Sequence, residues 1–297
     1  MVRLTRLLTT KTTAKAVVAL MLGVIGGVAV ATIAPAAEPK PWQFGMQPPA
    51  TEVMARLSAF HFGLLIVIFL ITIFVLTLLV VAMWRFNHRR HPVPTRTSHN
   101  TVIEMLWTVV PVVILVGIAI PSFKLMYYMD RVPNPEMTIK VTGHQWYWSY
   151  EYPDQDGLAF DSNIIPEVEL KPDQKRLLDV DNPLVVPAGA TIRVLITGTD
   201  VIHSWFVPSF GVQEYAVVGR LNESWMKIEH EGIYYGQCNQ ICGTNHSFMP
   251  ISIKAMAEAD FNTWVAQAKT KFANDNDAPA APTAVAQNAS VHAGDSE

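Results

Sequence analysis

The stretch Gln237-Cys238-Asn239-Gln240-Ile241-Cys242-Gly243-Thr244-Asn245-His246-Ser247-Phe248-Met249-Pro250 holds both cysteines of the chain. Cys242 follows Cys238 by four residues, His246 follows Cys242 by four, and Met249 comes three residues later. Thiolate, imidazole and thioether groups are soft ligands that suit copper. Gly243 and the proline at the end interrupt a helix, so the spacing indicates a loop that folds its side chains onto one centre.

A further ligand is expected from elsewhere in the chain, and His203 in Asp200-Val201-Ile202-His203-Ser204-Trp205 is the best candidate. Two thiolates, two imidazoles and a weak thioether are sufficient for two copper ions bridged by sulfur. The alternative is a disulfide, because two cysteines in an exported protein commonly form one. The histidine and methionine at ligand spacing favour the metal site.

The composition indicates membrane segments. Hydrophobic residues make up 50% and charged residues 16% of the 297 residues, which is apolar for a soluble protein. Residues 1–37 combine a basic start, an apolar run and a small-residue end, and they are predicted to be a secretory signal peptide. The alternative is a genuine first transmembrane helix, because the apolar run is long.

Two further apolar stretches, residues 58–84 and 104–128, are long enough to cross a bilayer. Between them lies the loop 85–103, with four arginines and no acidic residue before residue 97. By the positive-inside rule this loop is cytoplasmic. Residues 38–57 and everything after the second span are therefore expected outside.

Residues 129–256 change character, because short β-branched and aromatic runs alternate with turn residues. Many short strands at regular spacing predict an all-β sandwich or barrel, and the ligand loop lies between the last two expected strands. Residues 257–272 are predicted to form a helix. Residues 273–297 are rich in Ala, Asn, Asp and Pro, and we expect them to be disordered.

The motif Cys238-x-x-x-Cys242-x-x-x-His246-x-x-Met249, together with the stretch around His203 and the aromatic run 143–153, resembles cytochrome c oxidase subunit II and its binuclear copper (CuA) site. The resemblance covers roughly residues 41–264. It implies a mainly β fold, in which two transmembrane α-helices form an N-terminal hairpin that anchors a cupredoxin-like Greek-key β-barrel.

The resemblance also implies the role of each ligand. Cys238 and Cys242 would bridge two copper ions, and His203 and His246 would each bind one of them. Met249 and the backbone carbonyl of Gln240 would be weak axial ligands.

Electron entry and docking follow from the same resemblance. Trp146, which we expect to share one face of a strand with Trp148 and Tyr150, would be the point where electrons enter from cytochrome c. Between Asp130 and Asp260 there are 18 acidic and 9 basic residues, a balance of −9 that would steer a basic partner. The residues that match docking positions are Tyr147, Glu151, Asp161, Asp181 and Asp200.

Glu104 has two interpretations that can coexist. Thr101-x-x-Glu104 at the start of the second span is a capping box. Glu104 also matches a subunit II glutamate at the cytoplasmic membrane edge, where protons for subunit I would be taken up.

Two departures from the family pattern concern a second metal. Gln240 stands where the family carries a glutamate that helps bind Mg²⁺ or Mn²⁺ at the boundary with subunit I, and Tyr215 stands where an aspartate is usual. Hard divalent cations prefer carboxylate oxygen. We therefore expect this site to be absent or weaker than in the family, although the amide oxygen of Gln240 can still coordinate.

The implied protein is subunit II of a bacterial-type cytochrome c oxidase, an oxidoreductase and translocase of the respiratory chain. It would pass electrons from cytochrome c to haem in subunit I, where oxygen is reduced to water and protons are pumped. The expected partners are cytochrome c, subunits I and III and the inner membrane, with the copper domain on the periplasmic side and no nucleic acid. A quinol oxidase subunit lacks the copper ligands, and an anchored copper carrier has no need of Trp146 or an acidic docking face.

Overall fold

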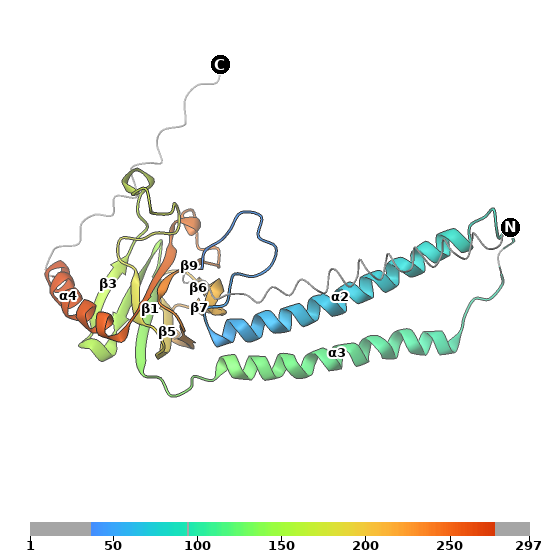
Figure 1. The fold of residues 1–297 in the computed structure, drawn as a ribbon, viewed down its shortest axis with the longest axis horizontal. Helices are drawn as coiled ribbons and strands as arrows, with labels where there is room; N and C mark the ends of the chain where they lie inside the picture. Colours follow the sequence, from blue (N-terminus) through green and yellow to red (C-terminus); the bar gives the residue numbers. More distant parts are fainter. Residues whose placement is uncertain (1–36, 94, 277–297) are drawn as a thin grey trace, which may run out of the picture. The chain divides into compact units, whose positions relative to one another are not determined.

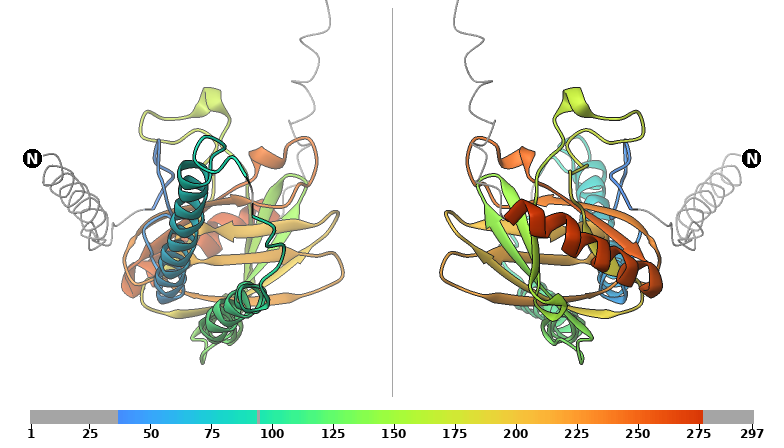
Figure 2. Two further views of the ribbon diagram at one scale, coloured as in Figure 1. Left: turned by 90° about the vertical axis from the view of Figure 1, so that its right-hand side faces the viewer. Right: turned by 90° about the vertical axis from the view of Figure 1, so that its left-hand side faces the viewer.

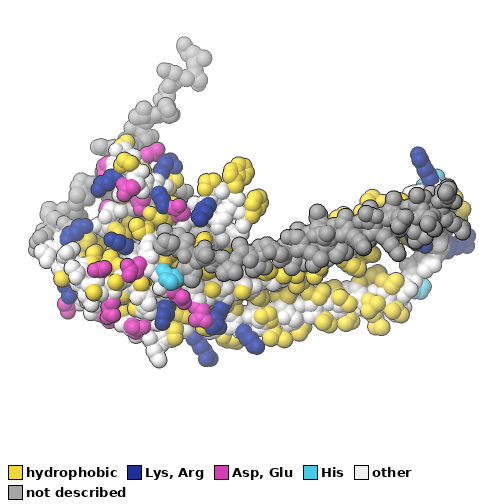
Figure 3. Space-filling view, in the orientation of Figure 1, with side chains coloured by type: hydrophobic (Ala, Val, Ile, Leu, Met, Phe, Trp, Pro, Cys, Tyr) yellow, Lys and Arg dark blue, Asp and Glu magenta, His cyan; other side chains and the backbone are white. Residues whose placement is uncertain are grey.

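A computed structural model describes residues 37–93 and 95–276 of the chain (Figure 1). The predicted signal peptide, apart from Ala37, and the tail after Asn276 lie outside the described residues. Two long helices, α2 (Glu52–Arg85) and α3 (Thr101–Asp130), come first. Both are long and apolar enough to cross a membrane, and Figure 3 shows apolar side chains along α3.

Helix α2 begins six residues earlier than residue 58, where the sequence analysis placed it. Thr51 is the N-cap, and its hydroxyl accepts a hydrogen bond from the backbone N–H of Met54 (3.1 Å). The apolar run in the sequence marks only the part of the helix that can lie in the hydrocarbon core of a membrane. The cap adds polar turns outside that part.

The cap of α3 is Asn100 rather than Thr101. The Asn100 side chain accepts hydrogen bonds from the N–H groups of Val102 (3.1 Å) and Ile103 (3.2 Å). Glu104 reaches back and accepts from the Asn100 N–H (3.2 Å). The reciprocal bonding expected of a capping box is therefore present, but it is shifted by one residue, because asparagine also caps helices well.

The β-domain contains two five-stranded sheets. The first has the strand order β3-β2-β1-β5-β8, and the second has the order β4-β10-β9-β6-β7. Their inward-facing side chains form one hydrophobic core. The strands are β1 (Met137–His144), β2 (Tyr147–Tyr152), β3 (Leu158–Ser162), β4 (Leu184–Pro187), β5 (Thr191–Gly198), β6 (His203–Val207), β7 (Val212–Ala216), β8 (Asn222–Lys227), β9 (Gly232–Cys238) and β10 (Pro250–Met256).

The aromatic run is not one strand, and the expectation for Trp146 is corrected here. His144 pairs with Tyr147, so Gln145 and Trp146 form the turn between β1 and β2. Trp148 and Tyr150 are buried in the core, as strand alternation predicts, whereas Trp146 is half-buried at the tip of the hairpin. Alternation alone did not reveal the turn, because neither of its two residues is Gly, Asn or Asp.

Helix α4 (Glu258–Asn276) covers an edge of the β-domain beside β3 and β4 (Figure 2). It continues past residue 272, where the sequence analysis ended it. The Phe272 ring stacks on Phe160 at a centroid distance of 4.6 Å, and Trp264 packs against Tyr152 at 5.6 Å. The helix therefore completes the core of the β-domain.

Tyr152 joins the two sheets by a pair of hydrogen bonds. Its hydroxyl donates to the Val185 carbonyl (2.9 Å) and accepts from the Val185 N–H (3.0 Å). The tyrosine is fully buried on β2, and Val185 lies on β4 of the other sheet. Both backbone groups of Val185 thus have a partner inside the core.

We predict that Tyr152→Phe lowers the free energy of unfolding of the outer domain by about 2 kcal/mol, because two buried backbone groups lose their partner. Denaturant unfolding of residues 130–276 measures this loss. Tyr215→Phe is the control, because Tyr215 is exposed and its removal should change stability little. Equal stability of the two variants would contradict the role of the inter-sheet bonds.

Candidate metal centre

The ligand loop, residues 239–249, connects β9 to β10, as the sequence analysis predicted (Figure 1). Cys238 is the last residue of β9, and Met249 immediately precedes β10. Antiparallel pairing of the two strands, with Gln237 opposite Pro250, holds the two ends of the loop together. The local sequence motif thus becomes a closed loop at one end of the second sheet.

The loop gathers its sulfur and nitrogen atoms around Cys242. The Cys242 Sγ lies 3.9 Å from the Cys238 Sγ, 3.5 Å from the Met249 Sδ and 3.4 Å from the His246 Nδ1. A disulfide needs an S–S distance of about 2.05 Å, and both cysteines are free. The carbonyl oxygen of Gln240 is 3.3 Å from the Cys238 Sγ.

His203 joins this cluster from β6. Its ligand atom and those of Cys238 and Cys242 all lie within 4.8 Å of one another, the one such group found among the described residues. The His203 Nε2 donates to Asp200 Oδ1 (2.8 Å), while the buried Nδ1 has no hydrogen-bond partner. A buried, unpaired ring nitrogen that faces two thiols fits a metal ligand.

The two thiols differ in acidity. Burial opposes ionisation of Cys238, but the neighbouring His203 ring and the Ser204 backbone lower its pKa overall. Burial and the neighbouring Cys238 raise the pKa of Cys242 to about 12. A metal that binds both sulfurs must therefore displace a proton from Cys242, so binding is coupled to proton release.

The turn between β1 and β2 lies directly on the loop. The Gln145 Nε2 donates to the Cys242 carbonyl (2.7 Å), and the Trp146 Nε1 lies 3.3 Å from the same oxygen. A Cβ on Gly243 would come within 3.0 Å of the Trp146 ring, and Gly243 has a φ of +123°. Glycine is therefore required here, both for the backbone conformation and for the close approach of the indole.

Trp148 supports the centre from the core, a role that the sequence analysis did not assign. Its Nε1 donates to the carbonyl of Met249 (3.1 Å), and its ring meets the His203 ring edge-on at a centroid distance of 6.0 Å. Alternation predicted that Trp148 is buried. No sequence signal indicated which loop it would contact.

The structure brings three of the five expected docking residues close to the Trp146 turn. Tyr147 is adjacent in sequence, Asp161 lies on β3 opposite Ser149 of β2, and Asp200 accepts a hydrogen bond from the Gln145 N–H (2.6 Å).

Asp181 and Glu151 lie beyond this inner group. The carboxylate of Asp181 caps the Asn163 N–H (2.7 Å), close to the end of β3. Glu151 is paired with Lys140 at 2.8 Å, so part of its charge is already neutralised. Of the two residues, Asp181 offers the freer carboxylate.

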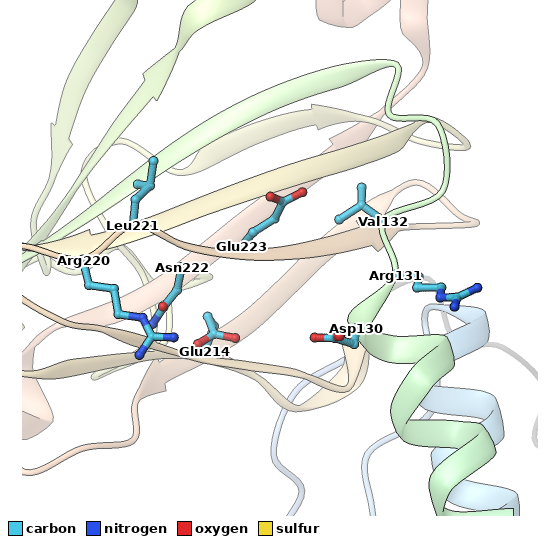
Figure 4. A pocket seen from close by; sticks show the side chains of 8 residues that line it. All are labelled: Asp130, Arg131, Val132, Glu214, Arg220, Leu221, Asn222 and Glu223. Carbon is cyan, nitrogen blue, oxygen red and sulfur yellow. The ribbon is translucent and has the colours of Figure 1, made fainter.

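A second, polar cleft lies away from the metal centre, between the end of α3 and strands β7 and β8. In Figure 4 the carboxylates of Asp130 and Glu214 point into it, Arg220 lies beside Asn222, and Arg131 points away. The charged residues that line this cleft are three acids, Asp130, Glu214 and Glu223, and two arginines, of which Arg131 points away.

Comparisons with known proteins agree with this site. The family model "Cytochrome C oxidase subunit II, periplasmic domain" matches residues 137–256, and "Cytochrome C oxidase subunit II, transmembrane domain" matches residues 39–125. The chain is 49% identical over 254 residues to a probable cytochrome c oxidase subunit 2 of Rickettsia bellii, covering 86% of this chain and 94% of the relative. It is 48% identical over 240 residues to cytochrome c oxidase subunit 2 of Arabidopsis thaliana, covering 79% and 92%.

Among solved structures, the chain is similar to the periplasmic domain of subunit II of cytochrome oxidase of Bradyrhizobium japonicum. The identity is 49%, the coverage is 48% of this chain and 99% of that chain, and the TM-score is 0.45. The two family models and the near full-length relatives confirm the resemblance seen in the ligand motif. The chain belongs to the cytochrome c oxidase subunit II family.

Proposed function

We propose that this chain is the electron-accepting subunit of a cytochrome c oxidase, which takes electrons from cytochrome c at a binuclear copper centre and delivers them toward haem in subunit I. The observation that carries the proposal is the convergence of His203, Cys238, Cys242, His246 and Met249 on one centre. Two copper ions held by these ligands would supply a one-electron carrier.

Asp200 prepares His203 for this role. It accepts the Nε2–H of His203, so the other ring nitrogen, Nδ1, is left to bind metal. Burial raises the pKa of Asp200, but hydrogen bonds from His203 and from the Val201 and Gln145 N–H groups lower it overall. The carboxylate therefore stays ionised at neutral pH and fixes the orientation of the imidazole.

Trp146 is proposed as the entry point for electrons. Its indole contacts the Cys242 carbonyl and the Gly243 backbone, so a short path leads from the half-buried ring to a ligand residue. The ring lies at the tip of a hairpin, where a partner can reach it. This contact favours electron transfer over copper storage, for which an aromatic bridge to the surface has no use.

The same side of the domain is proposed to dock cytochrome c. Asp161, Asp181 and Asp200 are exposed acidic residues, and Tyr147 and Glu151 are half-buried near them. Carboxylates around the entry point would steer a basic partner so that its redox centre approaches Trp146. The pairing of Glu151 with Lys140 leaves most of this steering to the aspartates.

Contact with subunit I is proposed for surfaces near the membrane and beside the metal loop. Large apolar side chains are exposed on β7, on the loop after β7 and on the loops beside the metal centre. Exposed apolar side chains of this kind are typical of a surface that a partner covers. They are Ile202, Tyr215, Val218, Leu221 and Ile241. Subunit III is a further proposed partner. We also propose that the protein lies in the inner membrane, with the copper domain on the periplasmic side.

Glu104 and the second metal site also remain proposals. Glu104 accepts the Asn100 N–H at the start of α3, and this cap is compatible with proton uptake at the cytoplasmic edge. Gln240 keeps a carbonyl oxygen beside Cys238 but offers a neutral side chain. Together with Tyr215 it removes two acidic groups, so we expect weak or absent binding of Mg²⁺ or Mn²⁺.

We predict that residues 130–276, which include the core-forming helix α4, bind two copper ions per chain when refolded with copper. Cys238→Ser and Cys242→Ser should each abolish the sulfur-bridged site, because each removes a bridging thiolate. Metal analysis and electron paramagnetic resonance test this. One zinc ion per chain, or a stable disulfide without metal, would refute the copper centre.

Asp200→Asn should weaken copper binding about 10- to 100-fold while the copper spectrum is retained, since the ligands stay but His203 loses its ionised partner. Competition with a copper chelator measures the affinity. Asp181→Asn is the matched control, because it removes an exposed acid that does not contact a ligand residue. Equal affinity of the two variants would show that Asp200 does not orient the histidine.

Trp146→Phe should strongly slow electron transfer from cytochrome c while binding of cytochrome c stays nearly unchanged, because the acidic surface is intact. Stopped-flow kinetics with reduced cytochrome c separates the two quantities. Asp181→Asn should do the reverse and weaken binding and its salt dependence. An unaltered transfer rate in the Trp146 variant would exclude this residue as the entry point.

A further inference from the structure

His144, the last residue of β1, makes three contacts that the metal centre does not use. Its ring stacks on Tyr147 with a centroid distance of 4.5 Å and an interplanar angle of 7°. Its Nε2 lies 3.0 Å from the Ser149 Oγ, and its Nδ1 lies 2.8 Å from the Thr199 Oγ1. Both ring nitrogens are therefore engaged, each by a hydroxyl group from a different strand or loop.

Counting hydrogens fixes the direction of these bonds. The Ser149 Oγ lies 2.5 Å from Asp161 Oδ1, and a carboxylate only accepts, so the single hydroxyl hydrogen of Ser149 points to Asp161. Ser149 must then accept from His144, which places a hydrogen on Nε2. The Thr199 hydroxyl has one hydrogen and two acceptors within reach, the His144 Nδ1 at 2.8 Å and the Gly143 carbonyl at 3.3 Å. With the neutral ring, Nδ1 accepts from Thr199 through the shorter of these contacts.

A neutral ring agrees with the surroundings of His144. Burial lowers its pKa, against the opposing influence of Asp161 and Asp200 and with a smaller contribution from His203 in the same direction as burial. Tyr147 covers one face of the ring. The network therefore needs no charge on the histidine to hold its partners.

The three partners of His144 lead to residues of the proposed docking surface. Ser149 leads to Asp161 on β3, the stacked ring is Tyr147 on β2, and Thr199 immediately precedes Asp200. These groups lie around the Gln145–Trp146 turn, whose backbone is itself bonded to Asp200. One half-buried side chain thus connects β1, β2, β3 and the loop after β5.

We propose that His144 is a positioning residue for cytochrome c docking, which holds the Asp161 carboxylate and the Tyr147 ring in fixed places beside Trp146. The proposal rests on the docking role proposed above. Its physical basis is preorganisation, because ordering a free side chain on binding costs affinity that a prearranged side chain does not lose. Among the described residues, the hydrogen bonds and ring stacking of His144 involve Ser149, Thr199 and Tyr147, and neither a proposed copper ligand nor Trp146. We therefore expect His144 to affect docking rather than transfer.

The test uses the purified oxidase complex with the full-length chain and steady-state oxidation of reduced cytochrome c. His144→Leu, which removes both hydrogen bonds and the stacking, should raise KM about three- to tenfold. The kcat and the copper absorption should stay unchanged. His144→Gln, which keeps an N–H donor toward Ser149, should show a smaller rise. His230→Leu is the matched control, an exposed histidine of the same domain, and should keep the KM of the unmodified complex.

A double-mutant cycle separates positioning from a purely structural role. Asp161→Asn should raise KM in the unmodified chain and raise it by a smaller factor in the His144→Leu chain, where the carboxylate is no longer held. Ser149→Ala cuts the same link with little change in volume, and it should also raise KM even if the His144 variants fail to assemble.

Three outcomes would overturn the proposal in distinguishable ways. An unchanged KM in His144→Leu or in Ser149→Ala, with a clear effect of Asp161→Asn, would exclude the positioning role alone. The positioning role would also be excluded if the KM of the double variant rose by the product of the factors measured for the two single variants. An unchanged KM in Asp161→Asn would instead remove Asp161 from the docking surface, and the proposed docking function would fail together with the role of His144.

Discussion

The pairing of β6 with β9 is the interaction on which the metal centre depends. It sets Trp205 opposite Cys238, and the Asn239 N–H extends the pairing with a hydrogen bond to the Ser204 carbonyl (3.2 Å). His203 and Cys238 are 35 residues apart in the chain (238 − 203), yet the main chain places them side by side. Because the sheet fixes both backbones, the remaining ligands need only a short loop to reach the same centre.

That loop is held from the opposite sheet. Strands β1 and β2 belong to the first sheet, and side chains from their hairpin bind two carbonyls of the loop, at Cys242 and Met249. Aromatic residues with a polar atom suit this task, since they fill the core and still satisfy a backbone group. The loop is therefore ordered by the packing of the two sheets.

Local features of this protein were predictable from sequence, and contacts between distant segments were not. The Cys, His and Met spacing identified the loop because all four ligands lie within twelve residues, and long apolar runs identified both helices. His203 was only the best candidate from the residues themselves, because a lone histidine carries no spacing signal, and the family resemblance then supported it. The turn at Gln145 and Trp146 was missed because its residues are not typical of turns, and the role of Trp148 was missed because alternation reports burial but not partners.

Asp200 shows why the docking surface and the metal centre cannot be treated as independent. Sequence reasoning assigned it to docking alone, yet one carboxylate oxygen binds His203 and the other binds the Gln145 N–H. Gln145 in turn binds the Cys242 carbonyl, so Asp200 connects a ligand histidine, the Trp146 turn and a ligand cysteine in one hydrogen-bonded frame. Asp181 also accepts hydrogen bonds, from Asn163 and the Asn182 N–H, but these lead to no ligand residue. The main contribution of Asp200 is to keep the entry point and the ligands in one fixed arrangement. A structural change at the surface of this turn therefore also alters the positions of the metal ligands.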